Sequence, residues 1–299
     1  MRTSLDCLPC IVRQAADASR MVTDDDGVVL EIMKIVFDRL ARADLSVTPP
    51  EIVRAVHAVI RRELHDADPF LSIKRKSTQR ALDIAASARE AIRNAGNPFA
   101  AALAFSIAGN ILDFGMRSEW NEAIITDSFS KALERSTAFD AEALARLRDE
   151  IAAADTVLVL GDNAGEAVFD RLLIEHFPRR KNVHYAVKAS PVINDATWED
   201  AAAAGIDEVA AIVSNGADIP GTVLWECSAE FQRIFHAADV VISKGQGNFE
   251  TLNEDPRKIW FLFQVKCPVI ANHYSFSVGD WMLLEKNGSC NEQDGLHSS

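Results

Sequence analysis

Asp162 and Asn163 stand side by side directly after an apolar, β-branched run, Val157–Leu160, and a single glycine, Gly161. Residues 167–176 then have a helical pattern, so the pair lies in a turn between a strand and a helix, where open α/β sheets bind ligands. A dinucleotide site would have small glycines in that turn to hold phosphate. Carboxylate and amide oxygens are instead the ligands that Mg²⁺ and Mn²⁺ prefer. The turn therefore indicates a metal site rather than a bare phosphate loop.

Polar side chains also follow other apolar runs of the chain. They are Lys188, Ser190 and Asp195 after one run, and Lys244, Asn248 and Glu250 after another. Lys244, with Asp162, is a candidate catalytic residue, and the candidate substrate contacts are Lys188, Ser190, Asn248 and Glu250. Because the carboxyl ends of parallel strands meet at one edge of a sheet, we expect these groups to converge. Asp162, Asn163 and Asp195 would supply three oxygen ligands and leave positions open for water and substrate. Lys188 and Lys244 would bind phosphate as point-like cations, and the glycines beside Lys244 would let backbone N–H groups approach an oxyanion.

Each of these groups also has a structural interpretation. Asp162 alone would serve as a helix N-cap, but the adjacent amide and the second carboxylate of Asp195 favour a metal site. Lys188 alone is better explained as a solvated surface lysine, but its position directly after an apolar strand makes the two interpretations equal. Asn110 is a candidate substrate contact, although the sequence slightly favours the view that Asn110 and Asp113 simply end an apolar helix.

Cys7 and Cys10 form a Cys-x-x-Cys pair near the start of the chain. A structural zinc site needs four ligands, and the other cysteines, Cys227, Cys267 and Cys290, have no matching spacing. A thioredoxin-like motif would follow a strand, which the polar start of the chain does not offer. We therefore interpret the pair as buried cysteines at the start of a helix.

Two regions of the chain are expected to position these residues. Residues 1–153 have helical periodicity, interrupted by prolines at 49–50, 69 and 98, with an apolar helix over 99–112 that we expect to be buried. Beyond residue 154, short apolar runs alternate with amphipathic stretches, at 156–160, 183–187, 209–213, 240–243 and 269–271. This alternation predicts the α/β class, with a helical N-terminal part packed on a doubly wound, mostly parallel sheet domain over 154–285. A flexible tail is expected over 286–299.

The composition limits the classes of partner. The chain has 299 residues, 48% hydrophobic and 25% charged, which is typical of a soluble globular protein. A net charge of −13 argues against general binding to nucleic acid or to an anionic membrane, but a metal or a local basic pocket would still allow an anionic substrate. No secretory signal, membrane-spanning run or disulfide framework is evident, so a cytoplasmic location is expected.

Together these motifs resemble the metal-dependent damage-control phosphatase family, also catalogued as domain of unknown function 89 and labelled protein-glutamate methyltransferase-like. The resemblance covers nearly the whole chain and rests on an ordered set of motifs: the Cys-x-x-Cys pair at 7–10, Asp-Pro-Phe at 68–70, Ile-Lys-Arg-Lys-Ser at 73–77, Ala-Gly-Asn at 108–110, Gly-Asp-Asn-Ala-Gly-Glu at 161–166, Ile-Asn-Asp-Ala-Thr at 193–197 and Lys-Gly-Gln-Gly-Asn at 244–248. The Cys-x-x-Cys start resembles the prokaryotic-type subgroup. The segment 272–277 is less typical of the family.

The resemblance implies an α/β domain with a helical cap and phosphatase activity on small phosphorylated metabolites, often reactive or damaged ones. It also implies one divalent metal ion (Mn²⁺, Mg²⁺, Co²⁺ or Ni²⁺) bound by Asp162, Asn163 and Asp195. Lys244, and less surely Lys188, match the family's phosphate-side positions.

Metal-assisted hydrolysis of a phosphomonoester fits these residues, because a cation and one or two lysines neutralise charge on the phosphate. Attack by water and attack by Asp162 are equally open, as are the substrate, the cellular metal and the oligomeric state. A methyltransferase using S-adenosylmethionine is a poorer alternative, since 161–165 has only two glycines. A non-catalytic metabolite-binding module is the other alternative.

Overall fold

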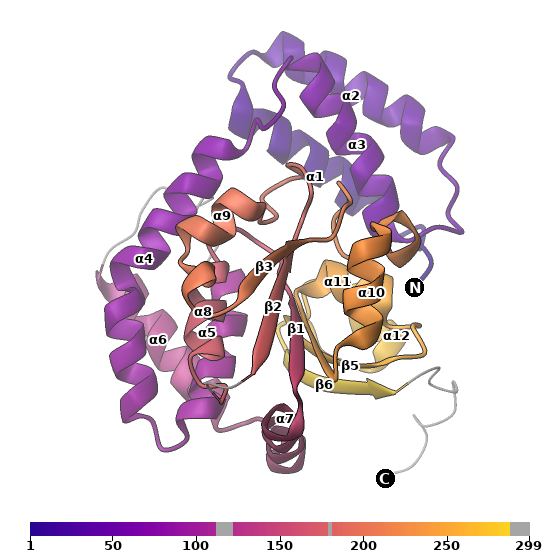
Figure 1. Ribbon diagram of the computed structural model, residues 1–299. Helices are drawn as coiled ribbons and strands as arrows, with labels where there is room; N and C mark the ends of the chain where they lie inside the picture. Colours follow the sequence, from indigo (N-terminus) through magenta and orange to yellow (C-terminus); the bar gives the residue numbers. More distant parts are fainter. Residues whose placement is uncertain (112–121, 179–180, 288–299) are drawn as a thin grey trace.

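A single six-stranded sheet organises the second half of the chain (Figure 1). The computed structural model describes residues 1–111, 122–178 and 181–287. The strands are β1 (Thr156–Leu160), β2 (Asn182–Val187), β3 (Ala211–Ser214), β4 (Val240–Lys244), β5 (Lys258–Gln264) and β6 (Trp281–Asn287). Their order is β3-β2-β1-β4-β5-β6, in which β1 to β5 are parallel and β6 is antiparallel to β5. The predicted class, an α/β fold with a mostly parallel sheet, is confirmed.

The strand order reverses direction between β1 and β4. Leu160 of β1 pairs with Ala186 of β2 on one side and with Ser243 of β4 on the other. Successive connections therefore leave this point in opposite directions, and in open α/β sheets ligands bind beyond the carboxyl ends of the strands at such a point. Asp162 follows β1 and Lys244 ends β4, so two predicted site residues lie at this switch point.

Helices cover both faces of the sheet, because side chains alternate along each strand. Val157 and Val159 face one core, whereas Leu158 and Leu160 face the other. Figure 1 shows the two helical layers on either side of the strands. Residues of the first core come from α4 (Leu71–Asn94), α5 (Pro98–Ile111), α6 (Glu122–Ser136), α7 (Ala141–Ala153), α8 (Ala167–Ile174) and α9 (Trp198–Ala203). The second core takes residues from α10 (Ala229–Ala237), α11 (Gln246–Leu252) and α12 (Pro268–Tyr274).

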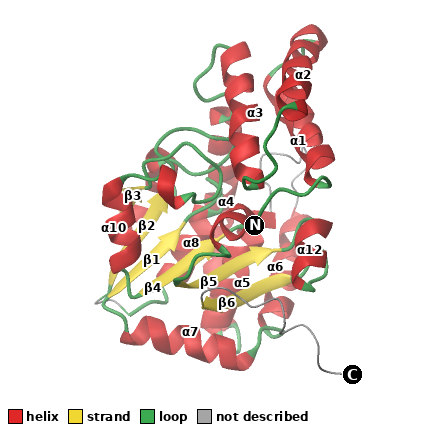
Figure 2. Ribbon diagram, turned by 90° about the vertical axis from the view of Figure 1, so that its right-hand side faces the viewer, coloured by secondary structure: helices red, strands yellow, loops and turns green. Residues whose placement is uncertain are grey.

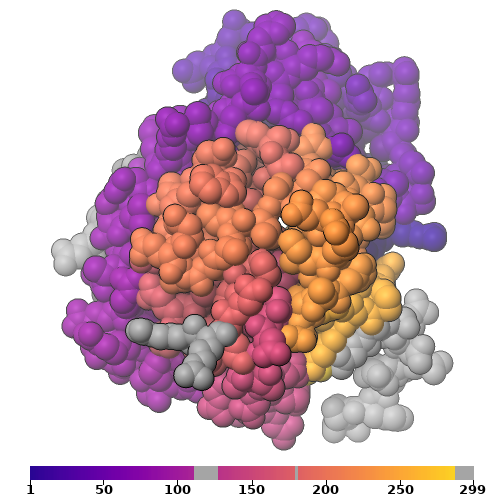
Figure 3. Space-filling model, viewed as in Figure 1, coloured from indigo at the N-terminus to yellow at the C-terminus, as the bar shows by residue number. Residues whose placement is uncertain are grey.

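The first three helices form a lobe with a core of its own. They are α1 (Cys7–Val22), α2 (Asp26–Ala41) and α3 (Pro49–Glu63), which bury residues such as Ala15, Ile32 and Ile60. Figure 2 shows this lobe beyond the carboxyl ends of the strands, and Figure 3 shows it as the indigo mass above the sheet part. The hydrophobic cores therefore divide the chain after α3. The predicted boundary lies at residue 153 instead, and it would separate α4–α7 from the sheet, with which these helices share a core.

Two elements near the C-terminus differ from the sequence prediction. The apolar run at 269–271 was expected to be a strand but lies in α12, because the Cys267 N-cap and Pro268 in the first turn start a helix there. The real strand is β5, a continuous apolar run that was not recognised although it is typical of a strand buried on both faces. β6 extends to Asn287, so the tail predicted from residue 286 begins at least two residues too early. Residues 288–299, like Asp113, lie outside the described residues.

The described helices include none that is both long enough and apolar enough to cross a membrane. The helical boundaries expected at the prolines are confirmed, since Pro49 begins α3 and Pro98 begins α5. The apolar helix over 99–112 is confirmed as α5, whose residues from Ala100 to Ala108 are buried; Leu112 lies outside the described residues.

His57 in the lobe is expected to make the stability depend on pH. It is 1% exposed, and among the described residues neither ring nitrogen has a hydrogen-bond partner. Burial, followed by the charge of Arg61, lowers the pKa of His57 from 6.5 to about 4. Because the unfolded chain takes up this proton at a higher pH, about 3 kcal/mol of stability should be lost as the pH falls from 6.5 to 4. The His57→Leu variant should not show that loss when its free energy of unfolding is measured with urea across this pH range. If its stability falls with pH in parallel with that of wild type, the expectation is wrong.

Candidate metal and phosphate site

The loops that follow β1 and β2 pair with each other through their backbones. The Ala196 amide donates to the Asp162 carbonyl at 2.8 Å, and the Ala164 amide donates to the Asn194 carbonyl at 2.9 Å. These bonds make an isolated antiparallel bridge between Asn163 and Asp195. Residues more than thirty positions apart are thereby fixed side by side, as the sequence predicted for the strand ends.

Two amides organise the carboxylates at the carboxyl end of β1. Asn110, on α5, donates from Nδ2 to Asp162 Oδ2 at 2.5 Å and to Glu166 Oε2 at 2.6 Å. Asn163 donates from Nδ2 to the same two oxygens at 3.0 Å and 3.2 Å. Asn110 therefore lines the site rather than merely ending its helix, and the Asn163 amide turns its Oδ1 away from these carboxylates.

Gly245 lets the turn after β4 approach Asp162 closely. Its φ of 77° and ψ of 156° lie in a region that is essentially restricted to glycine. A Cβ at this position would lie 2.0 Å from Asp162 Oδ2. The glycine predicted to allow close backbone approach does so, and the group that it approaches is the Asp162 carboxylate.

Lys244 lies beneath this cluster and is fully enclosed. Its Nζ donates to Glu166 Oε1 and Asp170 Oδ1, both at 2.5 Å, and to the Ser106 carbonyl at 3.1 Å. Asp170 also accepts hydrogen bonds from the Ser106 hydroxyl at 2.6 Å and from the Tyr185 hydroxyl at 2.8 Å. All three ammonium protons have acceptors, so Lys244 acts on the site through Glu166.

Burial makes the carboxyl groups near β1 harder to ionise than carboxyl groups in water. Burial, followed by the neighbouring Asp195 carboxylate, raises the pKa of Asp162 to about 6. Burial also raises the pKa of Asp195 to about 6 and that of Glu166 to about 7, although Lys188 and Lys244 respectively oppose these shifts. Carboxylates held in such surroundings gain stability from an added cation.

The donor set fits a divalent cation. Asp195 Oδ2 is buried and 3.5 Å from Lys188 Nζ, with no hydrogen-bond donor among the described residues. Within 1–111, 122–178 and 181–287, no three His, Cys, Asp or Glu side chains are arranged as a metal site. A cation here would therefore need a ligand of another type, and the amide oxygen of Asn163, whose backbone pairs with that of Asp195, is the candidate.

The chain is similar to known proteins over nearly its whole length. The family model of the damage-control phosphatase ARMT1-like domain matches residues 3–281. The chain belongs to this family. Membership confirms the predicted function class, a phosphatase, while the Cys-x-x-Cys subgroup stays a prediction.

Relatives cover nearly the whole phosphatase. A damage-control phosphatase of Pyrococcus horikoshii is 32% identical over 283 residues, covering 93% of this chain and 96% of the relative. An uncharacterised protein of Methanocaldococcus jannaschii is 33% identical over 292 residues and covers 94% of each chain. The crystal structure of a DUF89 family protein from Pyrococcus horikoshii matches with a TM-score of 0.87 at 31% identity, covering 96% of this chain and 100% of that one.

The remaining predicted site residues of the phosphatase have varied surroundings. Lys188 is buried beside Asp195, and its Nζ donates a hydrogen bond to the Gly221 carbonyl. Asn248 is fully buried and ties the strand ends together, donating to the Gly161 carbonyl at 3.2 Å and the Lys244 carbonyl at 2.7 Å. These contacts indicate a structural role for Asn248.

Ser190 and Glu250 lie outside the contacts that join Asp162 to Asp195. Ser190 is exposed in the loop after β2. Glu250 accepts a hydrogen bond from Gln246 at 2.7 Å, and burial raises its pKa to about 7. Their roles as substrate contacts stay predictions.

The cysteine pair of the phosphatase occupies the first turn of α1, as expected for a helix start. Cys10 is exposed, however, and Cys7 is only partly buried, so the expectation that both are buried is wrong. The first turn of this helix places Cys10 toward solvent, which the apolar character of cysteine alone did not indicate.

Sequence reasoning missed Lys266, an exposed lysine that contacts Asn110. It follows β5, and its Nζ donates to Asn110 Oδ1 and lies 3.4 Å from the Asn110 carbonyl. Its charge also acts on Asp162, whose pKa it lowers against the effect of burial. The available signal was its place just after a strand, but β5 itself was not recognised.

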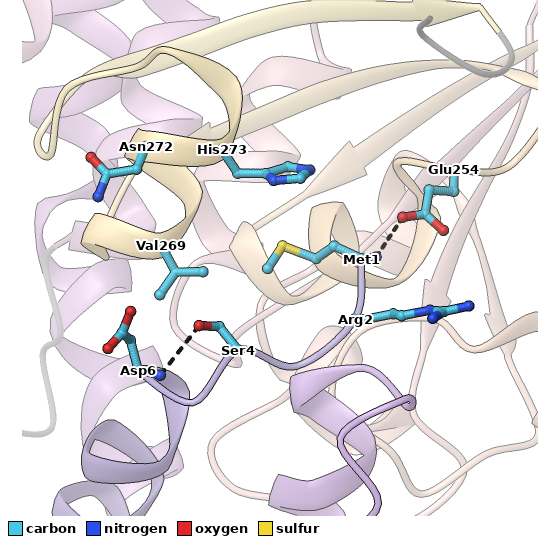
Figure 4. Close-up of a pocket in the computed structure, with 8 residues that line it drawn as sticks. All are labelled: Met1, Arg2, Ser4, Asp6, Glu254, Val269, Asn272 and His273. Atoms are coloured by element: carbon cyan, nitrogen blue, oxygen red, sulfur yellow. Dashed lines mark hydrogen bonds and ion pairs between the residues drawn. The ribbon is translucent and has the colours of Figure 1, made fainter. Parts of the chain in front are cut away.

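A cavity of about 490 Å³ lies elsewhere on the phosphatase, between the N-terminal segment and α12 (Figure 4). Arg2 and Asp6 line it on one side, and Asn272 and His273 on the other. It includes none of the residues predicted from the strand ends.

Proposed function

We propose that this phosphatase is a divalent-metal-dependent phosphomonoester hydrolase that acts on small phosphorylated metabolites. The observation that carries the proposal is the backbone pairing of the two loops, which brings Asn163 beside Asp195 and joins Asp162 to Ala196. This pairing supports Asp162, Asn163 and Asp195 as the oxygen ligands. The exposed ammonium group of Lys266 lies on the same side, through its contact with Asn110.

Asp162, Asn163 and Asp195 would hold the cation. When bound, Mn²⁺, Mg²⁺, Co²⁺ or Ni²⁺ would neutralise charge on a phosphate oxygen. Asn110 keeps the Asp162 carboxylate in position by donating to Oδ2, and Glu166 in turn holds Asn110. Outer contacts of this kind orient ligands and contribute strongly to metal affinity.

Lys266 and Lys244 take different parts in this proposal. Lys266 is exposed and would bind a phosphate oxygen as the substrate enters. Lys244 is 0% exposed and surrounded by acceptors, so it positions Glu166 instead of contacting substrate. This assignment replaces the catalytic role that the sequence predicted for Lys244.

Hydrolysis of p-nitrophenyl phosphate by the metal-stripped protein, with each of the four cations added separately, tests the proposal. A panel of small phosphorylated metabolites then identifies the preferred substrates. We expect phosphate release only with a divalent cation and its loss after chelation by EDTA. Freshly prepared, folded protein that releases no phosphate with any cation across the panel would contradict the proposal.

Lys266→Ala should weaken substrate binding. Removing one charged partner of a phosphate oxygen is expected to raise KM about tenfold, with a smaller change in kcat. Steady-state kinetics on the best substrate measures both constants. Lys34→Ala, which removes an exposed lysine of α2 paired with Glu31, serves as the control. Equal kinetics for the two variants would rule out Lys266 as a phosphate contact.

A further inference from the structure

We propose that Arg61, on α3 of the lobe, is a positioning residue that holds the Asp195 loop in its ligand-binding conformation. The proposal rests on the proposed function, because it treats Asp195 as a metal ligand. The lobe would then do more than lie beyond the carboxyl ends of the strands, since it would set the affinity of a site whose ligands all lie outside it.

Arg61 contacts the backbone of the loop directly. Its Nη1 donates to the Pro191 carbonyl at 2.7 Å, four residues before Asp195. Its Nη2 lies 3.5 Å from Asp218 Oδ2 in the loop after β3. One planar guanidinium group thus joins α3 to two of the loops that follow strands, and such a group loses little conformational freedom per bond.

The loop over 189–196 needs stabilising contacts from outside, because its backbone conformation is strained. Ile193 has a φ of 48°, in the left-handed region that β-branched residues rarely adopt. Its side chain packs against the core of the α1–α3 lobe. The strained residue immediately precedes Asn194 and Asp195, which pair with the Asp162 loop. The lobe therefore compensates a backbone conformation that the loop would not keep alone.

The far end of the same segment is also tied to the helices. Lys74 of α4 is buried and bonds Asp68 and Asp200, each at 2.8 Å. Asp200 in turn accepts the Thr197 amide at 3.0 Å. Arg61 and Lys74 bracket the Asp195 loop, but Lys74 is 1% exposed and its removal would damage the fold. Arg61, at 21% side-chain exposure, is the anchor that can be changed cleanly.

The experiment compares four proteins with wild type: Arg61→Met, Arg61→Lys, Arg54→Met and Asp195→Asn. Arg54 is the matched control, because it pairs with Asp218 at 2.8 Å and Glu226 at 3.2 Å from the same helix but does not bond Pro191. Calorimetric titration of the metal-free proteins with Mn²⁺ measures metal affinity. Hydrogen exchange of the peptide spanning 189–196 measures the order of the loop without metal, and thermal melting confirms the fold.

Arg61→Met should weaken Mn²⁺ binding about tenfold and speed exchange in the 189–196 peptide, because the loop that carries Asp195 loses an anchor, and contacts outside the ligands affect metal affinity on this scale. Arg61→Lys should restore part of both, and Arg54→Met should match wild type. Wild-type affinity and exchange for Arg61→Met would overturn the proposal, as would equal losses in Arg54→Met.

The Asp195→Asn and Arg61→Met proteins distinguish a failure of the proposed metal site from a failure of the proposed role of Arg61. If Asp195→Asn abolishes Mn²⁺ binding while Arg61→Met leaves it unchanged, the proposed function stands and the role of Arg61 is wrong. If Asp195→Asn binds Mn²⁺ as wild type does, the metal assignment itself is wrong, and with it the positioning role.

Discussion

Asp162→Ala is expected to lower kcat/KM for metal-dependent phosphate release by about a thousandfold or more. The substitution removes one proposed metal ligand and the acceptor that both Asn110 and Asn163 share. Initial rates on the best substrate and Mn²⁺ titration of the metal-free protein measure the two losses. Asp162→Asn, which keeps the shape but not the charge, should show a similar loss of activity.

The stability of the metal-free protein is not expected to fall with the activity in Asp162→Ala. Because the pKa of Asp162 is raised to about 6 by burial and by Asp195, its carboxylate disfavours folding of the metal-free protein above that pH. The metal-free Asp162→Ala protein should therefore unfold at the same urea concentration as wild type or a higher one at pH 8. The control Asp207→Ala, an exposed carboxylate of η1 (Ile206–Glu208), should retain activity. Retained activity and metal binding in Asp162→Ala would contradict the site.

Lys244→Met should reduce the free energy of unfolding by about 3–5 kcal/mol, because it leaves the carboxylates of Glu166 and Asp170 buried without their cation. Both oxygens lie 2.5 Å from Lys244 Nζ, and the Lys244 side chain is 0% exposed. Urea unfolding at pH 7.5 measures the change, and the loss should shrink at lower pH as Glu166, whose pKa burial raises to about 7, takes up a proton.

A double variant separates this charge effect from general damage to packing. Lys244→Met combined with Asp170→Asn should be less destabilised than the sum of the single variants, because both members of one ion pair are removed. A Lys244→Met protein with wild-type stability and only a raised KM would instead support the phosphate contact that the sequence predicted.

The sequence predicted the part of the site that depends on local pattern. The run before Gly161 is β-branched and ends in a polar turn, so the strand and the Asp162–Asn163 pair were recognisable without neighbours. Asp195 followed from the rule that the carboxyl ends of parallel strands share an edge. The backbone bridge between Asn163 and Asp195 realises that expectation.

The parts that were not predicted depend on partners distant in the chain. The surroundings of Lys244 come from α5, β2 and α8, so nothing near residue 244 indicates that two carboxylates enclose it. Lys266 was missed because β5 was not recognised, although Ile259 to Phe263 is a continuous apolar run. Arg61 is one basic residue among several on an amphipathic helix, and only tertiary contact distinguishes it.

The separate core of the α1–α3 lobe has a consequence for how the fold tolerates substitutions. Lys244 is enclosed by Ser106, Glu166 and Asp170, all of which lie outside the lobe. Substitutions in the core of the lobe therefore leave these contacts intact, as long as the few positions that contact the 191–195 segment are kept. The lobe and the sheet part can thus change their packing independently, and only the contacts that join them restrict both.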